Sequence, residues 1–413
     1  MTERNWAGTH EYGAAAIHRP ATVEELREIV ARAPRIRALG SRHSFTAIAD
    51  SDELVRVDGL SPAITVGDDR SHVSVAAGVR YGELARRLVP EGLAVHNLAS
   101  LPHISIAGAV ATATHGSGEA LGNLATAVRA ISLVTSDGEE LHVSRGDQDF
   151  DGLVVNLGAL GVVTRVTLDV VPAYDVQQRV YERLPLGRLL EHFDEIMGSG
   201  YSVSVFTRLE PVAEQVWVKR LDGEQAPDDV FGAAPARVER HPLAGMDAAN
   251  ATAQLDAPGA SWDRLPHFRM DFTPSAGDEI QSEYLLPRAH AVPALQALHE
   301  VGAEIRPLVQ VCEIRTVARD ALWLSPQYEQ DTVGVHFTWR PDRVGVERAL
   351  RVVESALSPF APRPHWGKLF LLGHEELRDR YERLDDFRSL AERLDPRGAF
   401  RNPWLDRHVL GPA

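Results

Sequence analysis

The second half of this chain repeats an alternation of apolar and polar residues, and this pattern limits the folds available to it. The alternation occurs between residues 201 and 339, in the segments YSVSVFTR, QVWVKR, QSEYLLP, VCEIRTV and VGVHFTW. A period of two is typical of strands that bury one face. Amphipathic stretches at 289–303 and 342–357 predict helices between these strands. We therefore predict an antiparallel sheet with helices, an α+β arrangement, beyond about residue 173.

The residues before 173 show a different pattern, and 413 residues exceed what one compact core usually holds. Thr22 and Glu25 have the spacing of a capping box and precede an apolar helical face, which predicts a helix from residue 23. Residues 35–40 predict a strand that leads into a turn. Hairpins are predicted around Gly67 and Gly138. The chain is therefore expected to form two domains.

Composition disfavours several classes of function. Acidic residues outnumber basic ones, 58 to 43, and the net charge of −15 disfavours nucleic acid and membrane surfaces as partners. The single cysteine, Cys312, excludes an intrachain disulfide. The sequence has no metal-binding motif, no signal-peptide pattern and no apolar run near the roughly 20 residues that span a bilayer. We expect a soluble, cytoplasmic, monomeric protein without a metal.

Two stretches of small residues suggest a site for a phosphorylated cofactor. Residues 98–118, LASLPHISIAGAVATATHGSG, favour neither helix nor strand. They are consistent with tight packing or with a backbone cradle for a diphosphate, although they match neither a P-loop nor a Rossmann fingerprint. The second stretch, GSRHSF, places His43 in a glycine-serine turn. A histidine there is either a hydrogen-bonded turn residue or a nucleophile held against an electrophilic cofactor.

Three predicted strands contain polar residues two positions apart, so each pair faces one side of the sheet. The pairs are Gln281 and Glu283, Glu313 and Arg315, and His336 and Thr338. They predict either a solvated face or a pocket wall that offers donors and acceptors to a polyhydroxylated ligand. Lys368, in HWGKLF, lies between bulky apolar residues, where an ammonium group is suited to stabilise an alkoxide or an anionic flavin.

Taken in order, GSRHSF, NLASLPHISIAGAVATATHGSG, GALGV, CEIRTV, HWGK and DPRGAFRN resemble stretches of the flavin-linked alditol oxidases. This family is a branch of the vanillyl-alcohol-oxidase-type flavoproteins, close to the sugar-lactone oxidases. The resemblance spans essentially the whole chain and implies a two-domain α+β flavoprotein. An FAD-binding domain of two α+β subdomains would comprise residues 1–173, joined by a returning C-terminal segment, 373–413. A substrate-binding cap with an antiparallel sheet and helices would comprise residues 174–372.

The resemblance further implies FAD bound covalently through His43. Some family members have a glycine at the position of Arg42, so the turn of this chain departs from that pattern. The implied cofactor-binding residues are Gly40, Ser41, Arg42, His43, Ser44, Ser100, Ser105, Gly108, Thr112, Ala113, Thr114, His115, Val162 and His365. The implied substrate-binding residues are Ser100, Gln281, Glu313, Arg315, Thr338 and Lys368.

The implied reaction oxidises the terminal primary hydroxyl of an alditol, such as xylitol or sorbitol, to the aldose, and reduces dioxygen to hydrogen peroxide. Arg315 and Lys368 are predicted to stabilise the alkoxide, Glu313 to bind neighbouring hydroxyls and His336 to take the proton. Two alternatives stay open: a sugar-lactone oxidase or dehydrogenase of the same fold, and a non-catalytic carbohydrate-binding protein, which would contain no flavin.

Overall fold

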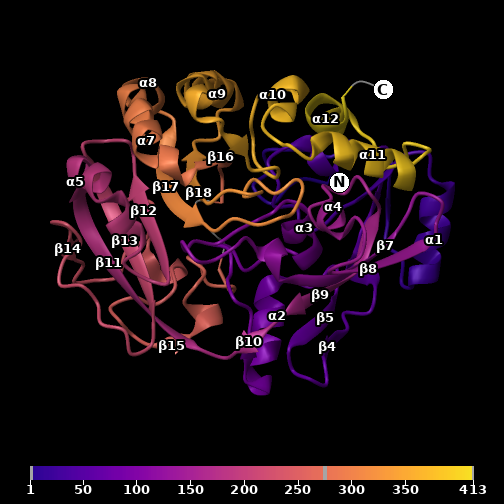
Figure 1. Ribbon diagram of the computed structural model, residues 1–413, viewed down its shortest axis with the longest axis horizontal. Helices are drawn as coiled ribbons and strands as arrows, with labels where there is room; N and C mark the ends of the chain where they lie inside the picture. The colour runs from indigo at the N-terminus through magenta and orange to yellow at the C-terminus, as the bar shows by residue number, and fades with distance from the viewer. Residues whose placement is uncertain (1–2, 273–276, 412–413) are drawn as a thin grey trace.

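Two sheets organise the first part of the chain (Figure 1). The structure, a computed structural model, describes residues 3–272 and 277–411, so the outermost ends of the predicted domains, 1–2 and 412–413, lie outside the described residues. A parallel sheet consists, in order, of β1 (Ala16–His18), β3 (Glu53–Val55) and β2 (Ile36–Ala38). An antiparallel sheet consists, in order, of β4 (Ile64–Val66), β5 (His72–Ala76), β9 (Val162–Asp169), β7 (Val128–Val134) and β8 (Glu140–Ser144). The predicted strand at 35–40 and both predicted hairpins are therefore confirmed.

The predicted N-terminal helix is α1 (Val23–Arg32), and its cap follows the sequence pattern with one change of partner. The Thr22 hydroxyl accepts a hydrogen bond from the Glu25 amide at 3.1 Å, as in a capping box. The Glu25 carboxylate accepts from the amide of Ala21, at 2.8 Å, one residue earlier than that motif requires. The other helices of this part are α2 (Tyr81–Leu88), α3 (Ile106–Ala111) and α4 (Phe150–Val154).

The prediction that residues 98–118 contain neither helix nor strand is wrong for α3. This short helix consists of isoleucine, valine, alanine and glycine, which gives no polar face for sequence periodicity to detect. Ala109 and Val110 are buried, so tertiary packing stabilises the helix.

A nine-stranded sheet forms the cap, and the predicted strands are confirmed as its centre. Its order is β14 (Ala234–Pro235), β11 (Asp175–Pro185), β13 (Val212–Leu221), β12 (Ser202–Thr207), β17 (Val309–Val317), β18 (Thr332–Trp339), β16 (Ile280–Pro287) and β19 (Arg363–Pro364), with β15 (Gly259–Ala260) paired to β11. A small pair, β6 (Leu93–Ala94) and β10 (Val171–Pro172), lies where the chain leaves the first part.

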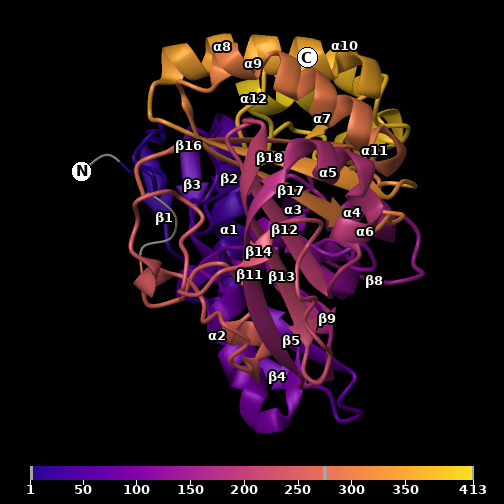
Figure 2. The same ribbon diagram turned by 90° about the vertical axis from the view of Figure 1, so that its left-hand side faces the viewer.

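Helices lie over the end of this sheet that contains β16 to β18, as Figures 1 and 2 show together. They are α7 (Ala291–Glu300), α8 (Gly302–Ile305) and α9 (Arg343–Leu357), with α5 (Leu186–Glu191) and α6 (Phe193–Met197) beside the neighbouring strands. Cys312, Ile314 and Phe337 belong to the same hydrophobic core as residues of α7 and α9. The opposite sheet face is left for the polar residues of the same strands.

The C-terminal segment returns to the first part of the chain. It contains α10 (His374–Arg378), α11 (Leu384–Leu394) and α12 (Pro403–Leu405), followed by a π-helical turn at Asp406–Leu410. The Asn402 side-chain amide donates to the carbonyls of Ala47 and Asp50, at 3.0 and 2.8 Å. The Arg397 guanidinium donates to the Ser136 carbonyl at 2.6 Å. These bonds fix the segment to turns of the first part.

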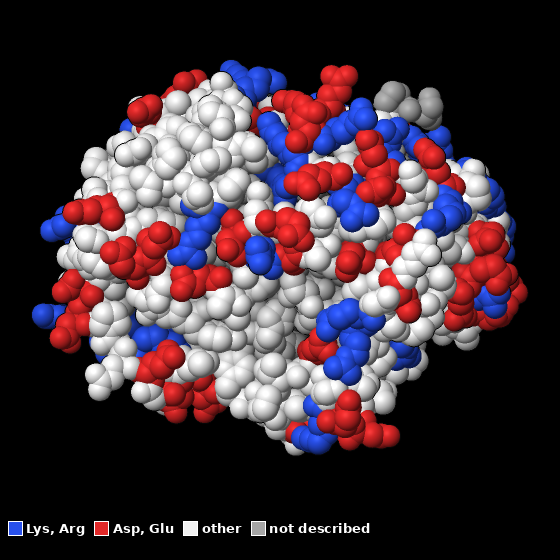
Figure 3. Space-filling model, in the orientation of Figure 1, with Lys and Arg blue, Asp and Glu red and all other residues white. Residues whose placement is uncertain are grey.

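Acidic and basic side chains are interspersed over the face in Figure 3, which shows no continuous basic patch. Among the described residues, no helix combines the length and apolarity needed to cross a membrane.

Candidate active site

One cavity is lined by residues of both the first part of the chain and the cap sheet. All but two of the residues predicted for the site line it, namely Gly40, Ser41, Arg42, His43, Ser44, Ser100, Ser105, Gly108, Thr112, Thr114, His115, Gln281, Glu313, Arg315, His336, Thr338, His365 and Lys368. The exceptions, Ala113 and Val162, are fully buried in the hydrophobic core, and the neighbours of Val162, Gly161 and Val163, line the cavity instead. The side chains of Ala113 and Val162 therefore do not face the site.

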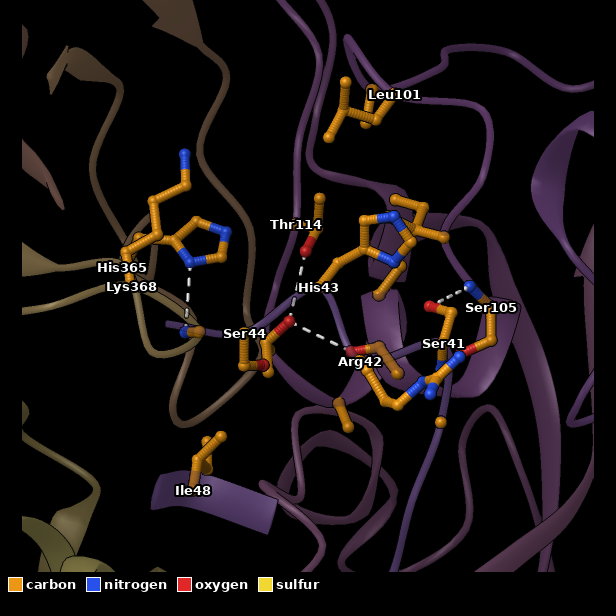
Figure 4. Close-up of a pocket in the computed structure, with 18 of the residues that line it drawn as sticks. Ser41, Arg42, His43, Ser44, Ile48, Leu101, Ser105, Thr114, His365 and Lys368 are labelled. Carbon is orange, nitrogen blue, oxygen red and sulfur yellow. Dashed lines mark hydrogen bonds between the residues drawn. The ribbon is translucent and has the colours of Figure 1, made fainter. Parts of the chain in front are cut away.

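Glycines bring the GSRHSF turn and the start of α3 close together. A Cβ on either Gly40 or Gly108 would lie 2.9 Å from the Ser105 hydroxyl, so a side chain at either position would clash. The Ser105 amide donates to the Ser41 hydroxyl at 2.9 Å, which ties the two stretches to each other (Figure 4). The result is a narrow cradle of backbone and hydroxyl groups, as a diphosphate requires.

Arg42 adopts the conformation that glycine would adopt without strain. Its φ is +62°, in the left-handed region, which explains why a glycine suits this position. The Arg42 guanidinium forms an ion pair with the Glu3 carboxylate. The Arg42 carbonyl accepts from the Trp6 amide at 3.1 Å. The N-terminal residues therefore hold the turn in shape despite the side chain.

His43 is held between aromatic rings. Its ring stacks on those of Trp6 and His103, with centroids 5.6 and 6.5 Å away and ring planes tilted by 26° and 28°. Burial, together with the nearby His103 and Arg80, lowers the pKa of His43 to about 3. Its Nδ1 is buried and has no hydrogen-bond partner of normal geometry within the described ranges. His43 is therefore a neutral imidazole with a nitrogen left without a partner.

The three predicted polar pairs form one surface, which we call the polar wall: Gln281, Glu283, Glu313, Arg315, His336 and Thr338. Strand register aligns them, because β18 pairs with both β16 and β17. His336 lies between Glu283 and Glu313, and Thr338 lies opposite Gln281. Gly334 lies opposite Arg315, and a Cβ there would lie 3.3 Å from the Glu283 carboxylate. The absence of a side chain at Gly334 thus leaves room for the charged groups.

Glu283 joins the cations of the wall, although the sequence analysis gave it only a place in a candidate pocket wall and no binding or catalytic role. Its carboxylate accepts from Arg315 Nη2 at 2.7 Å and forms an ion pair with Lys368. His115 Nε2 lies 3.3 Å from Glu283 Oε1, the oxygen that also contacts Arg315. Burial alone would raise the pKa of Glu283, but Arg315 and Lys368 more than offset this and lower it well below its usual value. Glu283 is therefore a buried anion that holds two cations at the cavity.

Lys368 also contacts His336, which fixes the direction of a hydrogen bond. An ammonium group has donors only, so His336 Nδ1 accepts from Lys368 Nζ at 2.7 Å. His336 Nε2 then faces the Thr338 hydroxyl at 3.2 Å. Burial, followed by the charge of Lys368, lowers the pKa of His336 to about 4, so the ring is neutral near pH 7.

Two further polar residues extend the wall, and the sequence analysis missed both. His267, from the loop before β16, bonds through Nε2 to Glu313 Oε1 at 2.8 Å. Lys219, on β13, contacts the other ring nitrogen at 3.1 Å. A signal for Lys219 was available, because Lys219 and Lys368 are the two lysines in a chain whose other basic side chains are arginines. His267 gave no comparable signal, since it lies in an irregular loop.

The residues around His43 fit FAD. The glycine cradle admits a backbone-bound diphosphate, and His43 offers a buried nitrogen without a partner. On the opposite side of the cavity, His365 and Lys368 lie next to each other (Figure 4). The Gly367 amide donates to His365 Nδ1 at 3.1 Å, and the Gly367 carbonyl accepts from Phe45 at 2.8 Å. No cluster of His, Cys, Asp and Glu among the described residues is arranged to hold a metal ion.

The families and relatives that match this chain agree with a cavity that fits FAD. The FAD binding domain family matches residues 14–144, and the D-arabinono-1,4-lactone oxidase family matches residues 276–408. The alditol oxidase of Streptomyces sp. (strain IKD472 / FERM P-14339) is 50% identical over 406 residues, which cover 97% of each chain. The L-gulono-1,4-lactone dehydrogenase of Mycobacterium tuberculosis is 32% identical over 431 residues, which cover 99% of each chain.

The fold also matches a solved structure. The crystal structure of cholesterol oxidase from B. sterolicum superposes with a TM-score of 0.80 at 15% identity, covering 99% of this chain and 96% of that one. At this identity the likeness shows the fold alone, and it confirms the predicted α+β flavoprotein fold. With half of its residues identical to those of an alditol oxidase along nearly the full length of both, this chain belongs to the alditol oxidase family of FAD-dependent oxidoreductases.

Proposed function

We propose that this protein oxidises the terminal primary hydroxyl of alditols, such as xylitol and sorbitol, to the aldose, with reduction of dioxygen to hydrogen peroxide. The observation that supports it most directly is the polar wall, which lines the same cavity as the His43 turn. Membership in the alditol oxidase family supports the same reaction. As parts of the proposal, the protein acts as a cytoplasmic monomer with domains at 1–173 plus 373–413 and at 174–372.

The polar wall suits a ligand with a hydroxyl on every carbon. Each hydroxyl gives up hydrogen bonds to water on binding, so the site must return both donors and acceptors. Glu313 supplies acceptors, Arg315 supplies donors, and Gln281 supplies both. Ser100 adds a hydroxyl from the first part of the chain, with its oxygen 3.4 Å from Arg315 Nη1. We assign these residues, with Thr338 and Lys368, to substrate binding.

Charge develops on the substrate oxygen as its hydroxyl loses a proton and the carbinol carbon loses a hydride. Arg315 and Lys368 are the cations that we assign to stabilise this charge, because both line the cavity and both are held by Glu283. Bound FAD supplies the hydride acceptor and returns the electrons to dioxygen. Burial lowers the pKa of Lys368. Lys368 can therefore pass one proton to His336 Nδ1 and then, as a neutral amine, take the hydroxyl proton, so that His336 is the final proton acceptor.

We also propose that FAD is attached covalently through His43. The low pKa keeps the imidazole neutral, and a neutral imidazole is the nucleophilic form. Its stacking between Trp6 and His103 fixes the plane of the ring. The remaining predicted cofactor contacts, including the backbone of Ala113 and Val162, belong to the same proposal.

The test uses the purified holoenzyme. Anaerobic xylitol or sorbitol should bleach the flavin absorbance, and aerobic turnover should release one hydrogen peroxide per aldose. If L-gulono-1,4-lactone reduces the flavin at least about tenfold faster than any alditol, the substrate class is wrong and the lactone alternative holds. A colourless protein that binds polyols without turnover would instead establish a carbohydrate-binding protein.

The covalent bond has a separate test. After acid precipitation, we expect the yellow colour to stay with the wild-type pellet and to appear in the supernatant for His43→Ala. His142→Ala, which removes an exposed imidazole outside the cavity and leaves His43 and its stacking partners in place, is the matched control and should retain the colour in the pellet. Release of flavin from the wild-type protein would contradict the covalent bond.

A further inference from the structure

Lysine occurs at two places in this chain, one buried and one partly buried. Lys219 and Lys368 are the two lysines, whereas arginine supplies the other basic side chains. Lys219 is 1% exposed. It lies on β13, two strands away from Glu313 in the sheet order. Both residues share a face, because Phe206 of β12 lies opposite Glu313 and also opposite Gln215, which is four residues before Lys219. A buried ammonium so close to the polar wall needs an explanation, since its desolvation is costly.

The surroundings of Lys219 supply as many acceptors as an ammonium group has protons. The carbonyls of Leu265 and Pro266 accept from Nζ, the latter at 3.2 Å. His267 Nδ1 is the third partner, at 3.1 Å. Three donors therefore meet three acceptors, which stabilises the charged form. Burial acts in the opposite direction and lowers the pKa of Lys219 to about 7, while Glu313 opposes that effect.

The contact with Lys219 determines the tautomer of His267. Because the ammonium can only donate, Nδ1 must accept, so the ring proton of a neutral imidazole lies on Nε2. Burial, followed by the charge of Lys219, lowers the pKa of His267 to about 4, so the ring is neutral. Nε2 then donates to Glu313 Oε1 at 2.8 Å. The alternative tautomer would point a lone pair at the carboxylate.

The chain of contacts runs through an apolar enclosure. The His267 ring lies edge-on to Phe206 and Trp217, with centroids 5.4 and 5.2 Å away. Lys219 Nζ lies 5.9 Å from the centre of the Trp217 ring. The His267 amide donates to the Ser100 carbonyl at 3.1 Å, which joins this loop to the first part of the chain. Aromatic walls strengthen each hydrogen bond within them because water is excluded.

We propose that Lys219 and His267 are positioning residues that hold Glu313 as an ionised, correctly oriented acceptor for the substrate's hydroxyl groups. The inference rests on the proposed alditol oxidation, because it concerns how that substrate is bound. Neither residue needs to touch the reacting carbon. Lys219 sets the tautomer of His267, and His267 occupies one Glu313 oxygen and leaves the other for substrate.

The kinetic test uses holoenzyme variants with xylitol. Lys219→Met removes the donor to Nδ1 with little change in volume, and we expect KM to rise about tenfold while kcat changes less than about threefold. His267→Gln retains an amide that can donate to Glu313 and should keep KM within about threefold, whereas His267→Leu should raise it as Lys219→Met does.

Thr252→Val is the matched control. The Thr252 hydroxyl donates to the same Pro266 carbonyl at 2.7 Å, so its loss disturbs the loop without touching the Lys219–His267–Glu313 contacts. Its KM should equal that of the wild type. An equal rise in KM for Thr252→Val, or an unchanged KM for Lys219→Met, would overturn the proposal.

A second measurement is made on the wild-type protein. Nitrogen-15 NMR of histidine-labelled wild-type holoenzyme, assigned with His267→Gln, should show Nδ1 of His267 unprotonated and Nε2 protonated. A proton on Nδ1 would overturn the proposal whatever the kinetics. If the wild type oxidises no alditol, the proposed function is wrong. The NMR measurement would still show whether Lys219 determines the tautomer of His267.

Discussion

A single residue, Arg42, shows how the N-terminal stretch compensates for a strained turn. A non-glycine residue in the left-handed region costs about 1–2 kcal/mol. Arg42 adopts that conformation with φ at +62°, and its guanidinium pairs with Glu3. The pair is partly exposed, so it contributes modestly. The ion pair therefore offsets part of the strain at Arg42.

This balance predicts the effect of Arg42→Gly. Relief of strain should offset loss of the Glu3 pair and the greater freedom of the unfolded chain, so the free energy of unfolding should change by less than about 1 kcal/mol. Arg42→Val, a β-branched residue at positive φ, should lose about 2 kcal/mol. Urea unfolding of both holoenzyme variants measures this. Equal losses for both variants would show that the guanidinium, and not the backbone, stabilises the turn.

At the scale of elements, alternation predicted which residues of each strand share a face, because successive side chains point to opposite sides. The alternation did not predict which residues of neighbouring strands lie opposite each other. That His336 lies between Glu283 and Glu313 follows from the pairing of β18 with two other strands, which depends on contacts distant in sequence. Lys219 was missed because β12 separates its strand from β17, and His267 because its loop has no period. The helix α3 was missed because its residues lack a polar face.

The register places Glu283 beside His336, where its carboxylate pairs with both Arg315 and Lys368, and this predicts a severe effect of Glu283→Gln. Arg315 and Lys368 would lose their buried partner, and breaking such a pair costs about 3–5 kcal/mol. We expect destabilisation of that order and a fall in kcat/KM on xylitol of at least about 100-fold.

Glu214→Gln on β13 is the comparison for Glu283→Gln. Glu214 pairs with Arg208 at 2.8 Å but is 30% exposed, so its loss should cost less than about 1 kcal/mol. Urea unfolding and steady-state kinetics measure both variants. Similar losses for the two would mean that burial does not strengthen the Glu283 contacts.

At the scale of the whole molecule, the fold buries several histidines in their neutral form. Burial lowers the pKa of His43 to about 3 and of His267 and His336 to about 4, from an ordinary value of 6.5. His408, in the returning C-terminal segment, behaves in the same way, with a pKa of about 4. Its ring packs against Phe370, and its Nδ1 lies 2.8 Å from the Leu372 carbonyl oxygen. Because a carbonyl only accepts, Nδ1 is the donor.

These shifts predict how stability depends on pH. Between about pH 6.5 and 4 the unfolded chain binds protons that the folded chain does not, so the free energy of unfolding falls as pH falls through this range. Each such histidine adds up to about 1.4 kcal/mol per pH unit. His408→Phe removes one of them at a site remote from the cavity residues, and its slope should be smaller by about that amount. Urea unfolding of the holoenzymes at a series of pH values tests this, and identical slopes would show that His408 is not buried as a neutral ring.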